Sequence, residues 1–301
     1  MATVLIGGGT GFVGGHLSRR LRRDGHEVRH LSRTRDLKAE FPAYHWDLTA
    51  GSIDEAALRD VDYLINLAGA GIADKRWSDA RKKVIIESRT KGNELLAATV
   101  ERLGLRPTLF VSAGAIGYYG DRGEEVMTEE AKPGEGFLST SCIVWEQSVG
   151  AMEKLGVPTA IVRTGIVLHP EEGALEKMLL PLKFGTSTYF GDGQQYYSWI
   201  HIEDLIDIYA FIIERQLTGV YNAVSPNPVR NKPFAAALGP AMGKNALVVP
   251  APEFALKVAL GEMSHTVLDS TRVSAAKLDI DLGFGFRFRE IEPALRDLVG
   301  R

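Results

Sequence analysis

Glycines recur at every third position directly after a short apolar run near the start of the chain. Gly8, Gly11 and Gly14 follow the apolar residues 4–6, and a helix is predicted over residues 12–23. A pyrophosphate needs backbone N–H groups at a helix N-terminus and a turn without side chains in the way. The order of strand, glycine turn and helix therefore predicts a dinucleotide site, with a ligand-free glycine turn as the alternative. The candidate contacts in this turn are Gly8, Thr10, Gly11, Phe12 and Val13.

The second predicted strand ends in a serine and an arginine. It covers residues 27–32, so Ser32 is its last residue, and Arg33 and Arg35 follow it. NAD-binding folds usually carry an acidic residue here for the ribose hydroxyls, and such an acid would repel a 2′-phosphate. An arginine instead pairs a phosphate through two N–H donors, and a serine adds a hydroxyl. Ser32 and Arg33 therefore predict NADP(H) over NAD(H), unless both arginines are only solvated loop residues.

Two further strand ends are candidates for contact with the cofactor. The fourth predicted strand ends in the sequence Asn-Leu-Ala-Gly, residues 66–69. Small residues there let the backbone approach the ribose and the pyrophosphate, although a tight turn would use similar residues. The candidate contacts are Leu67, Ala68 and Gly69. Asp47 ends the third predicted strand, where it either accepts from the adenine amino group or only closes a turn.

An arginine interrupts an apolar stripe on the long helix predicted over residues 78–103. Ile85, Arg89, Gly92 and Leu96 follow one another at helical spacing and share one face. An arginine on such a stripe needs a counter-charge. A cofactor phosphate and an internal carboxylate both satisfy that need, and the residues alone do not separate them.

Strands and helices alternate through the first half of the chain. The predicted strands are residues 3–6, 27–32, 44–46, 63–66, 108–112 and 159–163, and the predicted helices are 12–23, 53–58, 78–103 and 139–155. This alternation predicts an α/β fold with a Rossmann-type, doubly wound parallel sheet. Such a sheet binds its ligand at the carboxyl ends of its strands.

The second half changes character after Gly165, where proline and glycine become frequent. A helix at 202–214 and a strand at 219–223 are expected to return to the first domain. We therefore predict an NADP-binding Rossmann domain over 1–168 and 201–224. A smaller, mostly helical C-terminal lobe for the substrate is expected over 169–200 and 225–301.

Composition limits the partners of the protein. The 301 residues are 45% hydrophobic and 24% charged, with a formal net charge of −3 and one cysteine. We expect no nucleic-acid partner, because no basic tail or patch is present, and no membrane span, because no apolar run is long enough. No signal peptide precedes the first strand and no internal disulfide is possible, so we expect a cytoplasmic protein with a small-molecule substrate.

Several segments together resemble the extended short-chain dehydrogenase/reductase superfamily. The likeness is closest to its atypical "epimerase family" subgroup, which has human and bacterial members, and it covers essentially the whole chain. The segments are residues 7–14, 31–33, 66–69, 75–77, 87–89, 117–123, 162–168 and 198–205, with a tail at 282–288 like the subgroup's C-terminal domain. The resemblance implies a Rossmann domain that binds NADP(H) and a lobe that closes a substrate cleft. It also implies cofactor contacts from the glycine turn, Ser32, Arg33, Leu67, Ala68, Arg89 and Val167, with a phosphate as the partner of Arg89.

The chain departs from the superfamily where catalysis would be expected. Active members use a Tyr and a Lys one helical turn apart, because the ammonium lowers the pKa of the phenol that relays a proton. Anchored on Glu146, these positions fall at Leu138 and Cys142, which cannot do that work. The usual Ser or Thr falls near Gly114 or Ala115, where no hydroxyl is available.

Other side chains are therefore candidate proton carriers. Tyr118 and Tyr119 end the strand and loop expected to border the nicotinamide, unless both are core aromatics. His201 titrates near neutrality when unperturbed, but a histidine in such a place more often orders a loop. Cys142 has no basic partner in view and is expected to be a buried, inert thiol.

Two functions fit these observations. The preferred one is an NADP(H)-dependent oxidoreductase or epimerase for a small carbonyl or sugar-type substrate, with a rearranged proton relay. The alternative is a catalytically silent, NADP(H)-binding regulatory or redox-sensing protein, which the missing catalytic set favours. A sugar nucleotide would need a basic clamp, which only Lys183, Arg230 and Lys232 offer. The expected cleft walls are Trp77, Tyr189, Phe190 and Trp199.

Overall fold

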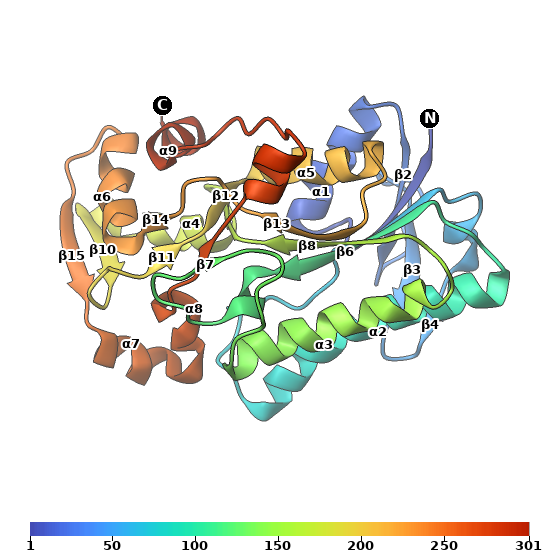
Figure 1. Cartoon of the computed structure of the whole chain (residues 1–301), viewed down its shortest axis with the longest axis horizontal. Coiled ribbons are helices and arrows are strands. Elements are labelled where there is room, and N and C mark those ends of the chain that lie inside the picture. Colours follow the sequence, from blue (N-terminus) through green and yellow to red (C-terminus); the bar gives the residue numbers. More distant parts are fainter. Residues whose placement is uncertain (301) are drawn as a thin grey trace.

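Eight strands form one sheet at the centre of the structure, a computed structural model that describes residues 1–300 (Figure 1). The strand order is β13-β8-β6-β5-β1-β2-β3-β4, and the neighbours are parallel except for β3 and β4. The strands are β1 (Thr3–Gly7), β2 (Glu27–Ser32), β3 (Ala43–Asp47), β4 (Ser52–Ile53), β5 (Tyr63–Asn66), β6 (Leu109–Ala115), β8 (Thr159–Thr164) and β13 (Gly219–Ala223). The doubly wound parallel sheet expected from the sequence is confirmed.

The chain reverses its direction of travel across the sheet between β1 and β5. It runs outward from β1 through β2 and β3 and then returns to the other side of β1 as β5. Ligands of doubly wound sheets bind in the crevice at such a switch point, beyond the carboxyl ends of the strands. The fold therefore brings the glycine turn after β1 and residues 67–69 after β5 to one crevice.

Two pairs of helices cover the two faces of the sheet. On one face lie α1 (Phe12–Arg23) and α5 (Ile202–Glu214), whose apolar side chains join the larger core. On the other face α2 (Asp79–Leu103) and α3 (Gly136–Glu153) lie side by side and contribute to a second core (Figure 1). The sheet is therefore covered on both faces, which explains why central strands such as β1, β5 and β8 are rich in apolar residues.

Several element boundaries differ from the sequence prediction by one or two residues, and three elements differ in type or by three residues. The helix expected at 53–58 is a short 3-10 turn, η1 (Glu55–Leu58), because Ile53 pairs with Trp46 in the sheet. The strand expected to end at Ser112 continues to Ala115, followed by η2 (Ile116–Tyr119). Helix α3 begins at Gly136 and not at Ser139, so residue 138 lies in its first turn.

The remaining elements form a lobe beside the sheet, on the left of Figure 1, and a set of connecting segments. Trp199, Phe234 and Leu238 are among the residues that form its separate core. The elements are β7 (Val126–Met127), β9 (Ile166–Leu168), α4 (Gly173–Leu179), η3 (Pro181–Phe184), β10 (Thr186–Phe190), β11 (Tyr196–Tyr197), β12 (Trp199–His201), β14 (Val229–Arg230), α6 (Asn231–Ala241), β15 (Leu247–Ala251), α7 (Glu253–Leu260), η4 (Gly261–Ser264), α8 (His265–Leu268), β16 (Arg272–Val273), the π-helical η5 (Lys277–Asp281) and α9 (Ile291–Val299).

The lobe combines helices with small two-stranded sheets, such as the parallel pair β10 and β15. Val273, Leu278 and Phe284 join the core over the Rossmann sheet, although they lie within the segment expected to belong to the lobe. The division of the chain into two domains stays a prediction, with residues 273–286 packed on the sheet. Within residues 1–300, no helix combines the length and apolarity needed to cross a membrane.

Candidate functional site

The glycine turn packs closely against backbone atoms at Gly8 and Gly14, which leaves no room for side chains there. Gly8 has φ +76°, and a Cβ atom on it would lie 2.9 Å from the backbone nitrogen of Ala68. A Cβ atom on Gly14 would lie 2.4 Å from the carbonyl oxygen of Gly8. Glycine at these positions therefore lets α1 begin directly against the turn, and lets the turn lie against the end of β5.

The N-terminus of α1 offers unpaired donors. Its N-cap is Gly11, which has no side chain to accept a hydrogen bond. Within residues 1–300, nothing accepts a hydrogen bond from the N–H groups of Phe12 and Val13. Such orphan N–H groups, together with the helix dipole, make a binding site for an anionic group.

A buried histidine supports this turn from below, and the sequence analysis missed it. His30 lies in β2 and is 4% exposed, and a Cβ atom on Gly9 would come within 2.2 Å of its ring. Its Nε2 lies 2.7 Å from the hydroxyl of Ser18, which donates to the carbonyl oxygen of Gly14 at 2.7 Å. Since that hydroxyl has one proton, Nε2–H is the donor toward Ser18. Burial lowers the pKa of His30 to about 4, so the ring is neutral.

The two arginines after β2 differ in their surroundings. Arg35 pairs with Asp54 at 3.3 Å, whereas Arg33 pairs with no carboxylate in the part of the chain that the structure describes. The carbonyl oxygen of Arg33 is held by Nδ1 of His45 at 2.9 Å, and Ser32 Oγ accepts from the backbone N–H of Thr34. The guanidinium of Arg33 therefore has no carboxylate partner among the described residues, while hydrogen bonds from neighbouring residues hold its backbone in place.

Arg89 lies against the loop after β5 and has no counter-charge. Its Nη1 donates to the carbonyl oxygens of Ala70 at 3.0 Å and Ile85 at 2.9 Å. Its guanidinium carbon lies 5.0 Å from the centre of the Trp145 ring, and a Cβ atom on Gly69 would lie 3.2 Å from that carbon. No carboxylate pairs with it in residues 1–300, so the internal-carboxylate alternative is wrong. A half-buried guanidinium with only carbonyl partners suits a phosphate.

Two other residues near the crevice have simpler roles. Asp47 Oδ1 accepts from the backbone N–H groups of Thr49 at 2.7 Å and Ala50 at 3.1 Å, which is the turn-closing role. Val167 lies in the short strand β9 beside Ile200 of β12. Within residues 1–300, no cluster of three or more metal-ligating side chains is present.

Helix α3 has neither partner of the usual catalytic pair. Leu138 lies in its first turn and lines a cavity, and Cys142 is buried one turn later. Burial raises the pKa of the Cys142 thiol to about 12, which agrees with the expectation of an inert cysteine. Ser112 is also buried, and its hydroxyl lies 3.3 Å from the side-chain amide nitrogen of Asn93.

The expectation that Tyr119 acts as a catalytic acid is wrong. The side chain is fully buried, and its hydroxyl donates to Oδ1 of Asn222 at 2.7 Å while accepting from Arg163 at 2.9 Å. Arg163 in turn forms a two-pronged ion pair with Glu146, with both distances 2.8 Å. Burial raises the pKa of Tyr119 to about 12. The phenol therefore joins η2 to β13 and to Arg163 of β8, which in turn reaches α3. Tyr118 is half-buried, with its ring centre 3.6 Å from the guanidinium carbon of Arg163.

His201 and Trp199 are structural residues. His201 Nδ1 accepts from the backbone N–H of Glu203 at 3.1 Å, which caps α5, and its ring stacks on Phe288 with the centres 3.9 Å apart. Trp199 is fully buried in the core of the lobe, and its Nε1 donates to the carbonyl oxygen of Asn227. Its expected place as a cleft wall is therefore wrong, whereas the loop-ordering alternative for His201 agrees with its hydrogen bonds.

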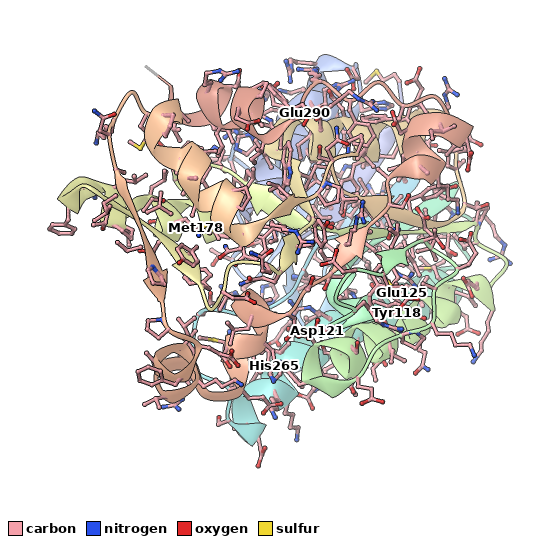
Figure 2. All side chains as sticks on the ribbon, turned by 60° about the vertical axis from the view of Figure 1, so that its left-hand side comes forward. Tyr118, Asp121, Glu125, Met178, His265 and Glu290 are labelled. Atoms are coloured by element: carbon pink, nitrogen blue, oxygen red, sulfur yellow. The ribbon has the colours of Figure 1, made fainter. Side chains whose placement is uncertain are left out.

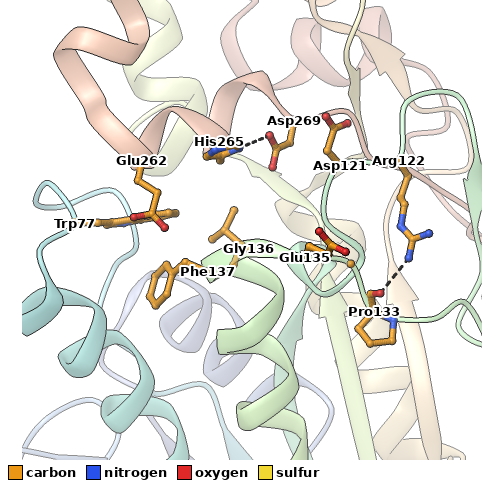
Figure 3. A pocket seen from close by; sticks show the side chains of 12 residues that line it. Trp77, Asp121, Arg122, Pro133, Glu135, Gly136, Phe137, Glu262, His265 and Asp269 are labelled. Atoms are coloured by element: carbon orange, nitrogen blue, oxygen red, sulfur yellow. Dashed lines mark hydrogen bonds and ion pairs between the residues drawn. The ribbon is translucent and has the colours of Figure 1, made fainter.

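A cavity of about 530 Å³ opens between the start of α3 and helix α8 (Figure 3). Of the expected walls, Trp77 lines it and Tyr189 and Phe190 do not. The expected basic residues Lys183, Arg230 and Lys232 also lie outside its lining. Arg230 pairs with Glu124 through both carboxylate oxygens, at 2.8 and 2.9 Å.

Known proteins with similar sequences and structures fall in one family. Residues 4–223 match the NAD dependent epimerase/dehydratase family, and residues 251–298 match the domain of unknown function DUF1731. The chain is 35% identical to the epimerase family protein ML0860 of Mycobacterium leprae, over 98% of this chain and 94% of that protein. It is also 35% identical to the epimerase family protein YfhF of Bacillus subtilis, over 98% and 97%.

A solved structure extends the likeness to three dimensions. The human epimerase family protein SDR39U1, crystallised with NADPH, has a TM-score of 0.87 at 30% identity and covers 99% of both chains. The family expectation drawn from the sequence motifs is confirmed. The chain belongs to the NAD dependent epimerase/dehydratase family, is SDR39U1-like, and carries a C-terminal DUF1731 domain.

Proposed function

We propose that this protein binds NADP(H) across the carboxyl ends of β1 and β5 and acts as an oxidoreductase or epimerase on a small carbonyl or sugar-type substrate. The proposal rests on one observation: unpaired backbone N–H groups and an unpaired guanidinium both lie at the carboxyl ends of the parallel strands. The orphan N–H groups of Phe12 and Val13 suit a pyrophosphate, and the unpaired guanidinium of Arg33 suits a 2′-phosphate. The human relative crystallised with NADPH supports the same cofactor.

The remaining contacts follow from the same crevice. The pyrophosphate would lie against Gly8, Thr10 and Gly11 with the start of α1, and Ser32 would join Arg33 at the 2′-phosphate. The backbone of residues 67–69 would border the ribose, with Arg89 toward a phosphate and Val167 toward the nicotinamide. When bound, the nicotinamide supplies hydride chemistry, while the protein supplies position and electrostatics.

The proton relay must differ from that of the wider superfamily, because Leu138 and Cys142 replace the usual pair. Tyr118 is the tyrosine that we retain as a candidate, since it is only half-buried and borders the start of α3. The missing pair also favours the second candidate function, a catalytically silent protein that binds NADP(H) and senses redox state.

The experiment that separates these functions starts from cofactor binding and then measures turnover. Purified protein is titrated with NADPH, and loss of NADPH absorbance is then followed with a panel of small aldehydes and ketones. We expect tight binding and slow turnover, with Tyr118→Phe losing turnover at unchanged NADPH affinity. Tyr119→Phe is the matched control, because the Tyr119 hydroxyl is buried in the core. Its loss should lower the free energy of unfolding rather than the rate of turnover. Tight binding without turnover on any carbonyl would favour the silent function.

A further inference from the structure

We propose that the cavity between α3 and α8 binds a small uncharged or cationic alcohol or carbonyl compound with a flat apolar part, and that it rejects nucleoside diphosphates. This inference rests on the proposed function, since it names the substrate class of the same cleft. The cavity is built from four separate segments of the chain, one of which is the loop at Asp121 and Arg122. The loop before α2 contributes Trp77, the start of α3 contributes Phe137 and Leu138, and the C-terminal region contributes Glu262 and His265 (Figure 3).

The cavity contains no cation that is free to hold a diphosphate. Arg122 is the only arginine or lysine in its lining within residues 1–300. Its Nε donates to the carbonyl oxygen of Tyr119 at 3.0 Å, and its Nη2 donates to those of Lys132 at 2.8 Å and Pro133 at 3.1 Å. Its Nη1 lies 3.5 Å from the carboxylate of Glu125. Nε and Nη2 are therefore held by the loop, and Nη1 faces the carboxylate of Glu125, so the charge of Arg122 is already paired and no unpaired cation lines the cavity within residues 1–300.

Carboxylates dominate the charge around the cavity. Its lining includes Asp121, Glu135, Glu262 and Asp269, of which Glu262 pairs with Lys82. Figure 2 shows Asp121 and His265 on the same side of the molecule, and Figure 3 shows both at the cavity. A diphosphate would bring further negative charges into this field without a free partner, whereas a cation or a neutral polar group meets no such repulsion.

One wall of the cavity is aromatic, with Glu262 beside Trp77 and its partner Lys82 lying 5.2 Å from the centre of the Phe137 ring (Figure 3). The rings of Trp77 and Phe137 meet edge to face, with centres 4.8 Å apart. The indole Nε1 already donates to the carbonyl oxygen of Ile72 at 2.8 Å, which fixes the ring. Leu138 adds an aliphatic side chain at the position where the superfamily carries its catalytic tyrosine. Such a wall suits a planar, apolar portion of a ligand.

A histidine paired with an aspartate provides the polar contact. His265 Nδ1 lies 2.8 Å from Oδ1 of Asp269, so the carboxylate holds the ring by that nitrogen. Nε2 has no partner within residues 1–300, and it remains for a hydroxyl or carbonyl oxygen of the ligand. The cavity thus combines a planar apolar wall, one imidazole and several carboxylates, which together select for an uncharged or positively charged compound.

The test compares three benzyl-type probes of different charge, together with one nucleoside diphosphate sugar, on the full-length protein with NADPH present. Benzylamine, benzyl alcohol, benzoate and UDP-glucose are titrated at millimolar concentrations, and the indole N–H resonance of Trp77 is followed by nuclear magnetic resonance. We expect benzylamine and benzyl alcohol to shift this resonance, with benzylamine binding roughly tenfold more tightly than benzoate. UDP-glucose should leave it unchanged. Glu262→Gln should reduce the preference for benzylamine, because one carboxylate is lost.

The control variants locate the binding. Leu138→Trp narrows the cavity beside Phe137 and should weaken the shifts strongly, whereas Leu180→Trp adds the same side chain at an exposed position on the lobe and should leave them intact. Binding of UDP-glucose that Leu138→Trp removes would overturn the proposal, as would equal binding of benzoate or no shift with any probe. NADPH affinity is measured in parallel. If the protein does not bind NADPH but keeps its preference among the probes, the proposed function is contradicted and the substrate class of the cavity is not.

Discussion

Replacing Arg33 with alanine should convert a preference for NADP(H) into near-indifference between the two nicotinamide cofactors. The guanidinium has no ion pair to give up within residues 1–300, so a 2′-phosphate would gain its full charge-assisted hydrogen bonds. Hydrogen bonds to charged groups contribute about 1.5–3 kcal/mol, which corresponds to roughly 10- to 150-fold in the dissociation constant. NADH lacks the phosphate, so its affinity should change by less than about twofold.

The measurement is a titration of each variant with NADPH and with NADH, followed by cofactor fluorescence at low and high salt. Arg35→Ala is the matched control, since Arg35 follows the same strand but already pairs with Asp54 at 3.3 Å. We expect Arg35→Ala to weaken NADPH by less than about threefold, because an exposed and paired charge contributes little. Equal weakening of both cofactors by Arg33→Ala would refute the reasoning. So would an effect of Arg35→Ala as large as that of Arg33→Ala.

Three further predictions follow from single side chains. Gly14→Ala should destabilise the fold by about 1–3 kcal/mol in thermal unfolding and weaken NADPH binding, because the added methyl group meets a backbone oxygen. Gly15→Ala is the control, since its methyl group meets nothing within 4 Å. It should be neutral or stabilise α1 by about 0.5–1 kcal/mol. His30 is held neutral in the fold, with its pKa lowered from 6.5 to about 4, so its contribution is complete above pH 6.5 and declines as the pH falls toward 4. Urea unfolding of the wild type and of His30→Gln should therefore diverge by about 3 kcal/mol between these pH values, and parallel pH profiles would contradict this. Cys142 should resist a thiol reagent at pH 8 in the native state and react only on unfolding, whereas rapid native labelling would show an accessible thiolate.

The cofactor crevice was predictable from the sequence because its determinants are local. Gly8 and Gly14 act through the backbone within one turn, and Arg33 follows its strand directly. The order of strands and helices fixed the sheet as well, since parallel strands with helical crossovers have few alternative arrangements. The partner of Arg89 was not predictable from the sequence, because a cofactor phosphate and an internal carboxylate both fit the same helical pattern. Residue spacing along the helix does not show which side chains lie near Arg89, whereas the structure shows no carboxylate beside it within residues 1–300.

The errors concern residues whose environment comes from distant segments. Tyr119 was a candidate acid by its place at a strand end, but its hydroxyl meets Asn222 and Arg163, far along the chain. Trp199 similarly turns into the core of the lobe. The support from His30 was missed because β2 mixes polar and apolar residues, so a histidine in it gives no sequence signal. Gly9 was the one hint, since its missing side chain leaves room for the ring of His30.

Compared with the wider superfamily, this site has a cation near the former lysine position but no acid at the former tyrosine position. In the wider superfamily a lysine one turn after the tyrosine lowers the pKa of the phenol. Here Arg89 of α2 lies close enough to Cys142 to oppose the rise in the pKa of that thiol, so a cation still lies beside the former lysine position. At the former tyrosine position, however, Leu138 has nothing to titrate. A fixed positive charge without a phenol can stabilise an oxyanion or a phosphate but cannot deliver a proton. Any turnover must therefore draw its proton from another side of the cleft, so the effect of Tyr118→Phe on turnover separates the two candidate functions.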